Sequence, residues 1–121
     1  MPQPPMMHPP AAALVEIRTT CPSREAAESL AARLVKDRLA ACVQVDGPVR
    51  STYEWRGDIE TADEWRCTCK TTAARAPACA AAIAAGHSYE TPEIIMALIE
   101  ASEAYAAWVR AGVSDTPGGG G

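Results

Sequence analysis

Phenylalanine is absent from this 121-residue chain, and the other aromatic residues are only three tryptophans and three tyrosines. Alanine is abundant instead, and a buried alanine contributes far less than the roughly 1.5–3 kcal/mol of a buried leucine or isoleucine. One copy of the chain would therefore make a small core. The composition predicts self-association that buries further surface.

Long apolar runs and an excess of positive charge are also missing. No stretch reaches the ~18 apolar residues of a membrane span, and the N-terminus has neither the basic segment nor the apolar segment of an export signal. Fifteen acidic residues against eleven basic ones give a net charge of −4, and the basic residues are scattered along the chain. These absences argue against a membrane protein and against nucleic-acid binding, and they predict a cytoplasmic protein.

A disulfide framework and the common catalytic motifs are missing as well. The five cysteines are odd in number and lack an export signal, so reduced thiols are expected. They are Cys21, Cys42, Cys67, Cys69 and Cys79. The chain has no Gly-x-Ser-x-Gly, no phosphate-binding glycine loop and no His-Glu-x-x-His, and the expected folded part holds one histidine, His87. We therefore expect a protein without enzymatic activity.

The two ends differ in composition from the centre. Residues 1–13 are rich in proline and methionine, and residues 114–121 end in four glycines. Such segments bury too little apolar surface to fold by themselves. We predict one domain, residues 14–113, between a disordered Pro-rich tail and a flexible Gly-rich tail.

Hydrophobic periodicity predicts six elements and a terminal helix. Alternation around residues 15–19 indicates a strand, and Ser23 opens a helix with an apolar stripe. A long strand, bent at Gly47-Pro48, and a returning strand from Glu64 to Thr71 form a hairpin, with residues 56–60 as the turn. A helix over 76–85, a strand over 94–99 that is apolar enough for burial on both faces, and a short helix capped by Ser102 complete the chain. The order β-α-β-β-α-β is typical of the ferredoxin-like α+β fold with an antiparallel sheet.

The connection between the second helix and the last strand is unusually polar. It reads Gly86-His87-Ser88-Tyr89-Glu90-Thr91-Pro92-Glu93-Ile94-Ile95. A turn needs fewer polar groups than this, so the segment is the first candidate for ligand contact. The alternative is a helix end whose histidine and glutamates face water.

Five motifs in order resemble the CutA divalent-cation tolerance family, over about Val15 to Val113. They are Arg38-Leu39-Ala40-Ala41-Cys42, Ser51-Thr52-Tyr53-Glu54-Trp55-Arg56-Gly57, Lys70-Thr71-Thr72, His87-Ser88-Tyr89-Glu90-Thr91-Pro92-Glu93-Ile94 and Tyr105-Ala106-Ala107-Trp108. The resemblance implies a ferredoxin-like protomer in a homotrimer, with hairpins pairing between subunits. It also implies tolerance of divalent metals and, in some bacterial members, copper binding. Similarity of that trimer to the PII proteins adds an alternative, a sensor that binds a small molecule in clefts between subunits. A third reading is a structural trimer that presents its tails to a partner.

His87, Cys21 and Cys42 are the candidate metal ligands. Imidazole suits copper and other transition metals, and thiolates suit reduced copper. The chain differs from the family at Thr19, where some copper-binding members have cysteine, and at Gly86, where some have a second histidine. Ser88 likewise replaces the usual proline. Copper or another divalent metal is the expected ligand, and a cap or surface role is the alternative for His87.

Two further groups have both a functional and a plain structural interpretation. The resemblance places Lys70, Tyr89 and Glu93 in an intersubunit cleft, beside the hairpin aromatics Tyr53 and Trp55. An anionic or zwitterionic ligand is expected in this cleft. The alternative is that Lys70 is a solvated surface lysine. Cys67 and Cys69 share one face of a strand and could share a soft metal, although core packing is the preferred interpretation. The tryptophans and tyrosines are interpreted as core and interface anchors.

Overall fold

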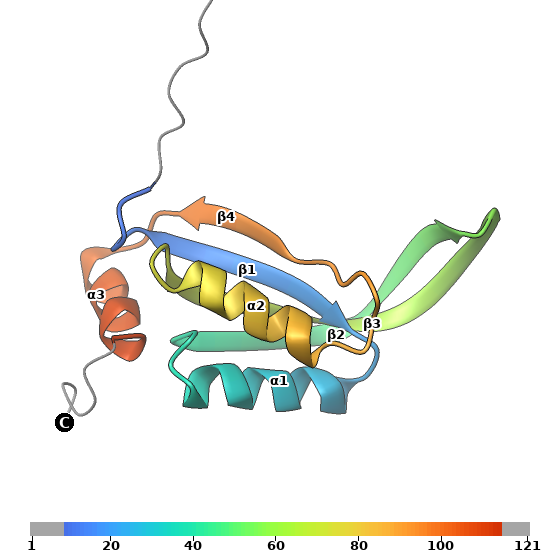
Figure 1. The fold of residues 1–121 in the computed structure, drawn as a ribbon, viewed down its shortest axis with the longest axis horizontal. Helices are drawn as coiled ribbons and strands as arrows, with labels where there is room; N and C mark the ends of the chain where they lie inside the picture. The colour runs from blue at the N-terminus through green and yellow to red at the C-terminus, as the bar shows by residue number, and fades with distance from the viewer. Residues whose placement is uncertain (1–8, 115–121) are drawn as a thin grey trace, which may run out of the picture.

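The computed structural model describes residues 9–114 and confirms the predicted order of elements (Figure 1). The elements are β1 (Leu14–Cys21), α1 (Arg24–Lys36), β2 (Cys42–Trp55), β3 (Asp58–Thr72), α2 (Ala76–Gly86), β4 (Ile95–Ile99) and α3 (Glu103–Gly112). Two predicted caps are present. The hydroxyls of Ser23 and Ser102 accept hydrogen bonds from the backbone N–H groups of Ala26 and Tyr105, which fixes where α1 and α3 begin.

The four strands form one antiparallel sheet in the order β2-β3-β1-β4. Helices α1 and α2 lie side by side over one face of it (Figure 1). Alternation along β1 points Ile17 and Thr19 toward the helices, while Glu16 and Arg18 lie on the other, open face. Among residues 9–114, helices α1 and α2 cover only the face that carries Ile17, and the centre of the other face carries the charged residues Glu16, Arg18 and Lys70.

The β2–β3 hairpin is longer and tighter than the sequence indicated. Its turn is only Arg56 and Gly57, both with positive φ (51° and 87°), and β3 already begins at Asp58. This two-residue geometry matches the twist of the flanking strands, so pairing continues to the tip. β1 pairs with β3 only from Trp65 onward, so the hairpin beyond that point projects as an arm (Figure 1).

The core lies between the sheet and the two helices. Its largest fully buried side chains include Ile17, Leu34 and Ile83. Cysteines fill a notable part of this space: Cys21, Cys67, Cys69 and Cys79 are all buried, and Cys42 is half-buried. Thiols therefore supply core volume that larger apolar residues provide elsewhere, as expected for free cysteines.

A single chain does not bury the last strand on both faces, so the predicted burial would need a neighbouring subunit. Ile95, Met96 and Leu98 of β4 are 51%, 53% and 63% exposed. The physical reason is position: β4 is an edge strand, bonded only to β1, and α2 does not extend over it. A strand this apolar at an open edge is a surface for another chain.

Most of the tryptophans and tyrosines are not anchors of the core, although a core role had been predicted for them. Trp55 and Trp108 are each more than half exposed, Tyr53 and Tyr105 are also exposed, and only Trp65 packs against the core. Trp55 lies near the tip of the arm, and Trp108 stacks on Tyr105 on α3. Their role as interface anchors stays a prediction.

Residues next to both ends of the predicted domain, 14–113, are bonded to it. The carbonyls of Ala11 and Ala13 accept hydrogen bonds from the N–H groups of Ala74 and Ala73, and the carbonyl of Ser114 accepts one from Arg38. The remaining parts of the two predicted tails, residues 1–8 and 115–121, lie outside the described residues. Between residues 9 and 114, no helix is both long and apolar enough to cross a bilayer.

Candidate functional site

His87 ends α2 and ties it to the end of β1. Its Nε2 lies 2.6 Å from the carbonyl oxygen of Thr20, and its Nδ1 accepts a hydrogen bond from the N–H of Tyr89 at 3.1 Å. Because a carbonyl can only accept, Nε2 carries the proton, and the ring is a neutral tautomer with both nitrogens used. A metal could bind this imidazole only by displacing one of the two bonds.

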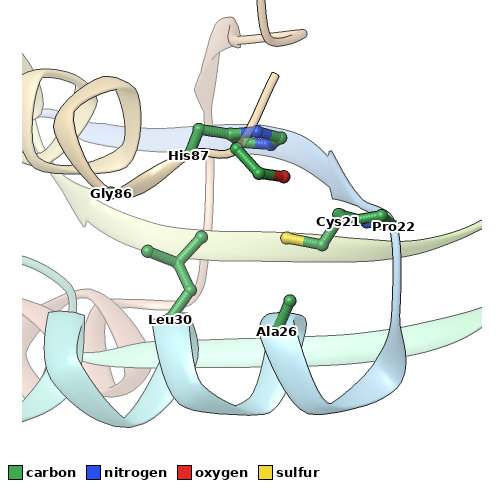
Figure 2. A pocket seen from close by; sticks show the side chains of 7 residues that line it. Cys21, Pro22, Ala26, Leu30, Gly86 and His87 are labelled. Carbon is green, nitrogen blue, oxygen red and sulfur yellow. The ribbon is translucent and has the colours of Figure 1, made fainter.

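A small cavity of about 90 Å³ separates this imidazole from the first turns of α1 (Figure 2). The sulfur of Cys21 faces it from the end of β1, and Leu30 and Ala26 close it from the helix. The cavity is far smaller than the ~300 Å³ at which sites for small molecules begin. It can take an ion or a water but no metabolite.

Only two of the three predicted metal ligands meet at this cavity. Cys21 and His87 both line it, but Cys42 does not. Cys21 lies opposite Trp65 and Cys42 opposite Lys70 on β3, a separation of about 16 Å along the strand. Residues 9–114 contain no group of three or more His, Cys, Asp or Glu side chains able to hold one metal ion. Of the predicted donors, His87 and Cys21 therefore share one cavity, and Cys42 lies apart from both.

The buried thiols form two pairs that the sequence did not reveal. The Cys67 thiol donates a hydrogen bond of 3.5 Å to the carbonyl oxygen of Ala27 on α1. Its interaction with Cys21 lowers the pKa of Cys21, and the same interaction together with burial raises the pKa of Cys67. Cys69 and Cys79 form the second pair, in which the pKa of Cys79 is lowered by its bond from Cys69. Cys67 therefore interacts with Cys21, and Cys69 interacts with Cys79. The prediction had instead paired Cys67 with Cys69 as ligands of one metal.

A larger groove lies between the hairpin arm and the connection after α2. Its volume is about 900 Å³. Twelve residues line it: Thr20, Ser51, Thr52, Tyr53, Trp55, Glu60, Glu64, Ser88, Tyr89, Glu90, Thr91 and Glu93. Four of the five predicted cleft residues are among them, namely Tyr53, Trp55, Tyr89 and Glu93. One chain therefore supplies a groove of metabolite size from residues far apart in sequence.

Carboxylates and rings dominate this groove. Tyr89 donates a hydrogen bond of 2.9 Å from its hydroxyl to Glu64 on the arm, which links the two walls. Burial and the neighbouring carboxylate raise the pKa of Tyr89 to about 12, so its phenol stays neutral and remains a donor. None of the twelve lining residues is basic.

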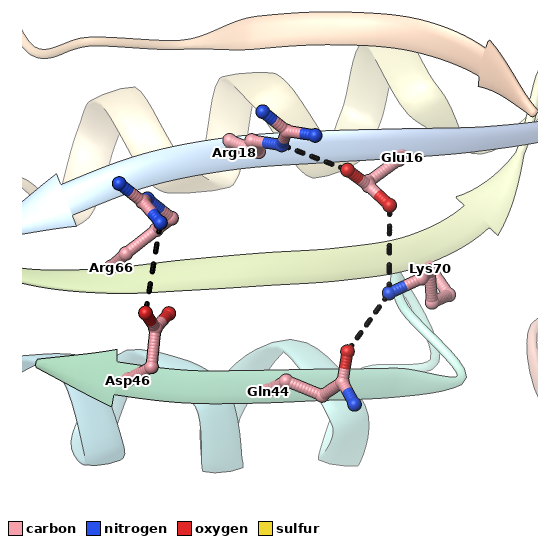
Figure 3. Close-up of polar contacts among 6 residues, drawn as sticks. All are labelled: Glu16, Arg18, Gln44, Asp46, Arg66 and Lys70. Atoms are coloured by element: carbon pink, nitrogen blue, oxygen red, sulfur yellow. Dashed lines mark hydrogen bonds and ion pairs between the residues drawn. The ribbon is translucent and has the colours of Figure 1, made fainter.

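Lys70, the fifth predicted cleft residue, lies elsewhere in the chain (Figure 3). Its Nζ is 3.0 Å from the side-chain oxygen of Gln44 and 3.6 Å from a carboxylate oxygen of Glu16, on the open face of the sheet. Arg18 bonds the same carboxylate at 2.8 Å, and this bond is the main reason that the pKa of Glu16 is lowered. Within one chain, Lys70 therefore belongs to a charge network and not to the groove.

Sequence reasoning missed several residues of the two sites. Cys67 was considered only with Cys69, and Thr20, Glu60, Glu64 and Glu90 were not singled out. The alternation of β3 could have found Glu60 and Glu64, because both occupy the face that carries Tyr53 and Trp55 once the register of the hairpin is known. That register depends on a bulge between Asp46 and Val49 that shifts the pairing by one residue.

Comparison with known proteins decides the family. A sequence profile of the CutA1 divalent ion tolerance protein matches residues 15–112. This chain belongs to the CutA1 family. Protein CutA of Homo sapiens is 37% identical over 92 residues, covering 75% of this chain and 51% of that protein. The divalent-cation tolerance protein CutA of Thermus thermophilus is 36% identical over 92 residues, covering 75% of this chain and 89% of the relative.

Solved structures agree with the sequence comparison. CutA from Xylella fastidiosa has a TM-score of 0.82 and 34% identity, covering 84% of this chain and 99% of that chain. The chain spans only about half the length of the human, mouse and Arabidopsis thaliana relatives. Names in the CutA1 family describe tolerance of divalent cations and not an enzymatic reaction.

Membership of the CutA1 family bears on the residue at position 86, which is glycine in this chain. Some CutA1 members were noted above to carry a histidine here, but in this chain the guanidinium of Arg33 occupies the space that any side chain at position 86 would enter. The positive charge of this exposed side chain disfavours a metal ion beside Gly86.

Proposed function

We propose that this CutA1 protein acts, without a catalytic step, as a homotrimer in tolerance of divalent cations. The observation that carries the proposal is the uncovered apolar edge of the sheet, where Ile95, Met96 and Leu98 are more than half exposed. Trp108, also more than half exposed, adds a large apolar side chain from α3. Apolar surface of this kind on a small, Ala-rich domain is stabilised by burial against further copies.

Light scattering on purified protein tests the assembly. The proposal predicts about three times the chain mass of 12.7 kDa at micromolar concentration. Leu98→Glu places a charge on the exposed edge and should shift the mass toward one chain, whereas Glu28→Gln on the solvent side of α1 should leave it unchanged. A monomeric wild-type protein would contradict the proposal.

For the metal, we propose copper bound by the thiols of Cys21 and Cys67. The thiols of Cys21 and Cys67 lie close enough to shift each other's pKa, and Cys21 also faces the small cavity. Thiolates prefer copper in its reduced state, which Cys21 at the end of β1 and Cys67 on β3 could hold once both have lost their protons. His87 stays bonded to Thr20 and Tyr89 in this proposal and shapes the cavity without ligating the ion.

The large groove favours a second candidate function, a sensor that binds a small molecule. Its volume of about 900 Å³ is within the range of sites for metabolites, and its lining combines three aromatic rings with nine polar or charged side chains. In a trimer, further copies would border it, as in the PII-like alternative. A thermal-shift screen with neutral, anionic and cationic metabolites tests this function, because a ligand should raise the Tm of wild-type protein but not that of Trp55→Leu.

A further inference from the structure

The groove between the arm and residues 88–93 carries negative charge on both walls. Glu60 and Glu64 line it from β3, and Glu90 and Glu93 line it from the connection after α2. Within residues 9–114, none of these four carboxylates is in an ion pair, since the ion pairs there involve other acidic residues. Uncompensated carboxylates around a groove raise the local concentration of cations and repel anions.

We propose that this groove binds a small organic cation with an ammonium or guanidinium group. The inference rests on the second candidate function above, a ligand site in the groove, and adds the chemical class of the ligand. It differs from the expectation of an anionic or zwitterionic ligand, which depended on Lys70. Lys70 is not in the lining, so one chain offers an anion no partner there.

The aromatic rings distinguish an organic cation from a metal ion. Tyr53, Trp55 and Tyr89 line the groove, and Tyr53 and Trp55 are 43% and 51% exposed. The faces of such rings attract organic cations, which shed water more easily than a hard divalent metal. The chain already shows one such contact, because the guanidinium carbon of Arg56 lies 5.4 Å from the centre of the Trp55 ring.

A metal ion fits the same residues poorly. Hard divalent ions require several oxygen ligands converging within about 2.0–2.6 Å of one point. No three acidic, His or Cys side chains among residues 9–114 are close enough together for that. Carboxylates spread over two walls instead suit an extended cation with more than one charged nitrogen.

Thr20 adds a neutral acceptor to the lining. Its side chain lines the groove from the end of β1, although the residue as a whole is only 7% exposed. Its backbone carbonyl is bonded to His87, while its hydroxyl is accessible and is not among the buried polar atoms that lack a partner. An ammonium group has three donors and no acceptor, so this hydroxyl and the carboxylate of Glu64 form a suitable set of acceptors.

Calorimetric titration of the full chain with spermidine tests the proposal, with succinate and magnesium chloride as comparison ligands. We expect spermidine to bind and succinate not to bind. Glu64→Gln and Trp55→Leu should each weaken spermidine binding by about tenfold, while Trp55→Phe, which keeps a ring, should retain most of it. Glu28→Gln, an exposed carboxylate outside the groove, is the matched control and should bind as wild type does.

Other outcomes overturn the proposal in distinguishable ways. If magnesium binds as tightly as spermidine and Trp55→Leu has no effect, the groove merely attracts counter-ions. If neutral or anionic metabolites bind in a Trp55-dependent way and spermidine does not, the ligand class is wrong while the ligand site stands. If no compound of any class binds, both the ligand class and the sensor function are wrong. Circular dichroism of each variant separates lost binding from lost folding.

Discussion

His87 donates a hydrogen bond from Nε2 to the backbone carbonyl of Thr20 across 2.6 Å, and this single contact fastens the end of α2 to the end of β1. The same imidazole accepts a bond from the N–H of Tyr89 and so fixes the start of the groove wall. A residue that the sequence presented as a metal ligand is a structural bridge between the small cavity and the large groove.

Replacing His87 therefore tests structure more than metal binding. His87→Ala should lower the free energy of unfolding by about 1–3 kcal/mol, because the Thr20 carbonyl loses a partner. Copper affinity, measured by anaerobic competition titration, should change little in this variant. Cys21→Ser should weaken copper binding strongly, and Cys42→Ser, at the far end of the sheet, is the control. Loss of copper binding in His87→Ala with Cys21→Ser unaffected would contradict the thiol site.

Two threonines on the same face of the sheet, Thr19 on β1 and Thr71 on β3, give a matched pair. Thr71 is fully buried and donates a hydrogen bond of 2.7 Å to the carbonyl of Leu39, whereas Thr19 is fully buried and its hydroxyl has no partner. Thr71→Val should destabilise the protein by about 1–3 kcal/mol, and Thr19→Val should be neutral or stabilising. Urea unfolding of both variants measures the difference, and equal effects would show that the Thr71 bond adds nothing.

The phenol of Tyr89 should ionise at a higher pH than an ordinary tyrosine. Burial, and then the bond and charge of Glu64, raise its pKa from 10.0 to about 12. Its folded pKa lies above the unfolded one, so the stability it contributes is complete below pH 10 and is lost as pH rises toward 12. Absorbance at 295 nm should show an ionisation near pH 12 that Tyr89→Phe lacks. A Tyr89 ionisation near 10 would mean that the bond to Glu64 is not formed.

Gly47 is required at the bend of β2. Its φ is +154°, and a Cβ there would lie 2.7 Å from the Trp65 ring and 3.0 Å from the backbone oxygen of Glu64. Gly47→Ala should cost at least about 1–3 kcal/mol, because both the backbone and the contact are strained. Gly57→Asn at the hairpin tip, where nothing lies within 4 Å, is the control and should cost little, since asparagine tolerates positive φ. Thermal unfolding of the two variants compares them.

Local signals were enough for the order of the fold. Alternation in β1 and β3, the Ser23 and Ser102 caps and Pro77 in the first turn of α2 each specify an element through its own residues. The surroundings of an element were harder to predict, because they depend on its position in the tertiary structure. An apolar run such as Ile95–Ile99 is compatible with a central strand or an edge that another chain covers, and only the strand order distinguishes the two.

The candidate sites were predictable only in part. Cys21 and His87 could be named as chemically suitable donors, but the Cys21–Cys67 contact depends on the register between β1 and β3. Lys70 was assigned to the groove from a resemblance that concerns several subunits, and one chain places it beside Glu16. The cytoplasmic location stays a prediction.

Native mass spectrometry of the full chain, purified without added metal, tests the central claim most directly, because it reports subunit number and bound copper together. The account predicts one dominant species at three times the chain mass of 12.7 kDa, which gains copper on titration in wild type but not in Cys21→Ser. A single-chain species that takes up no copper would contradict it.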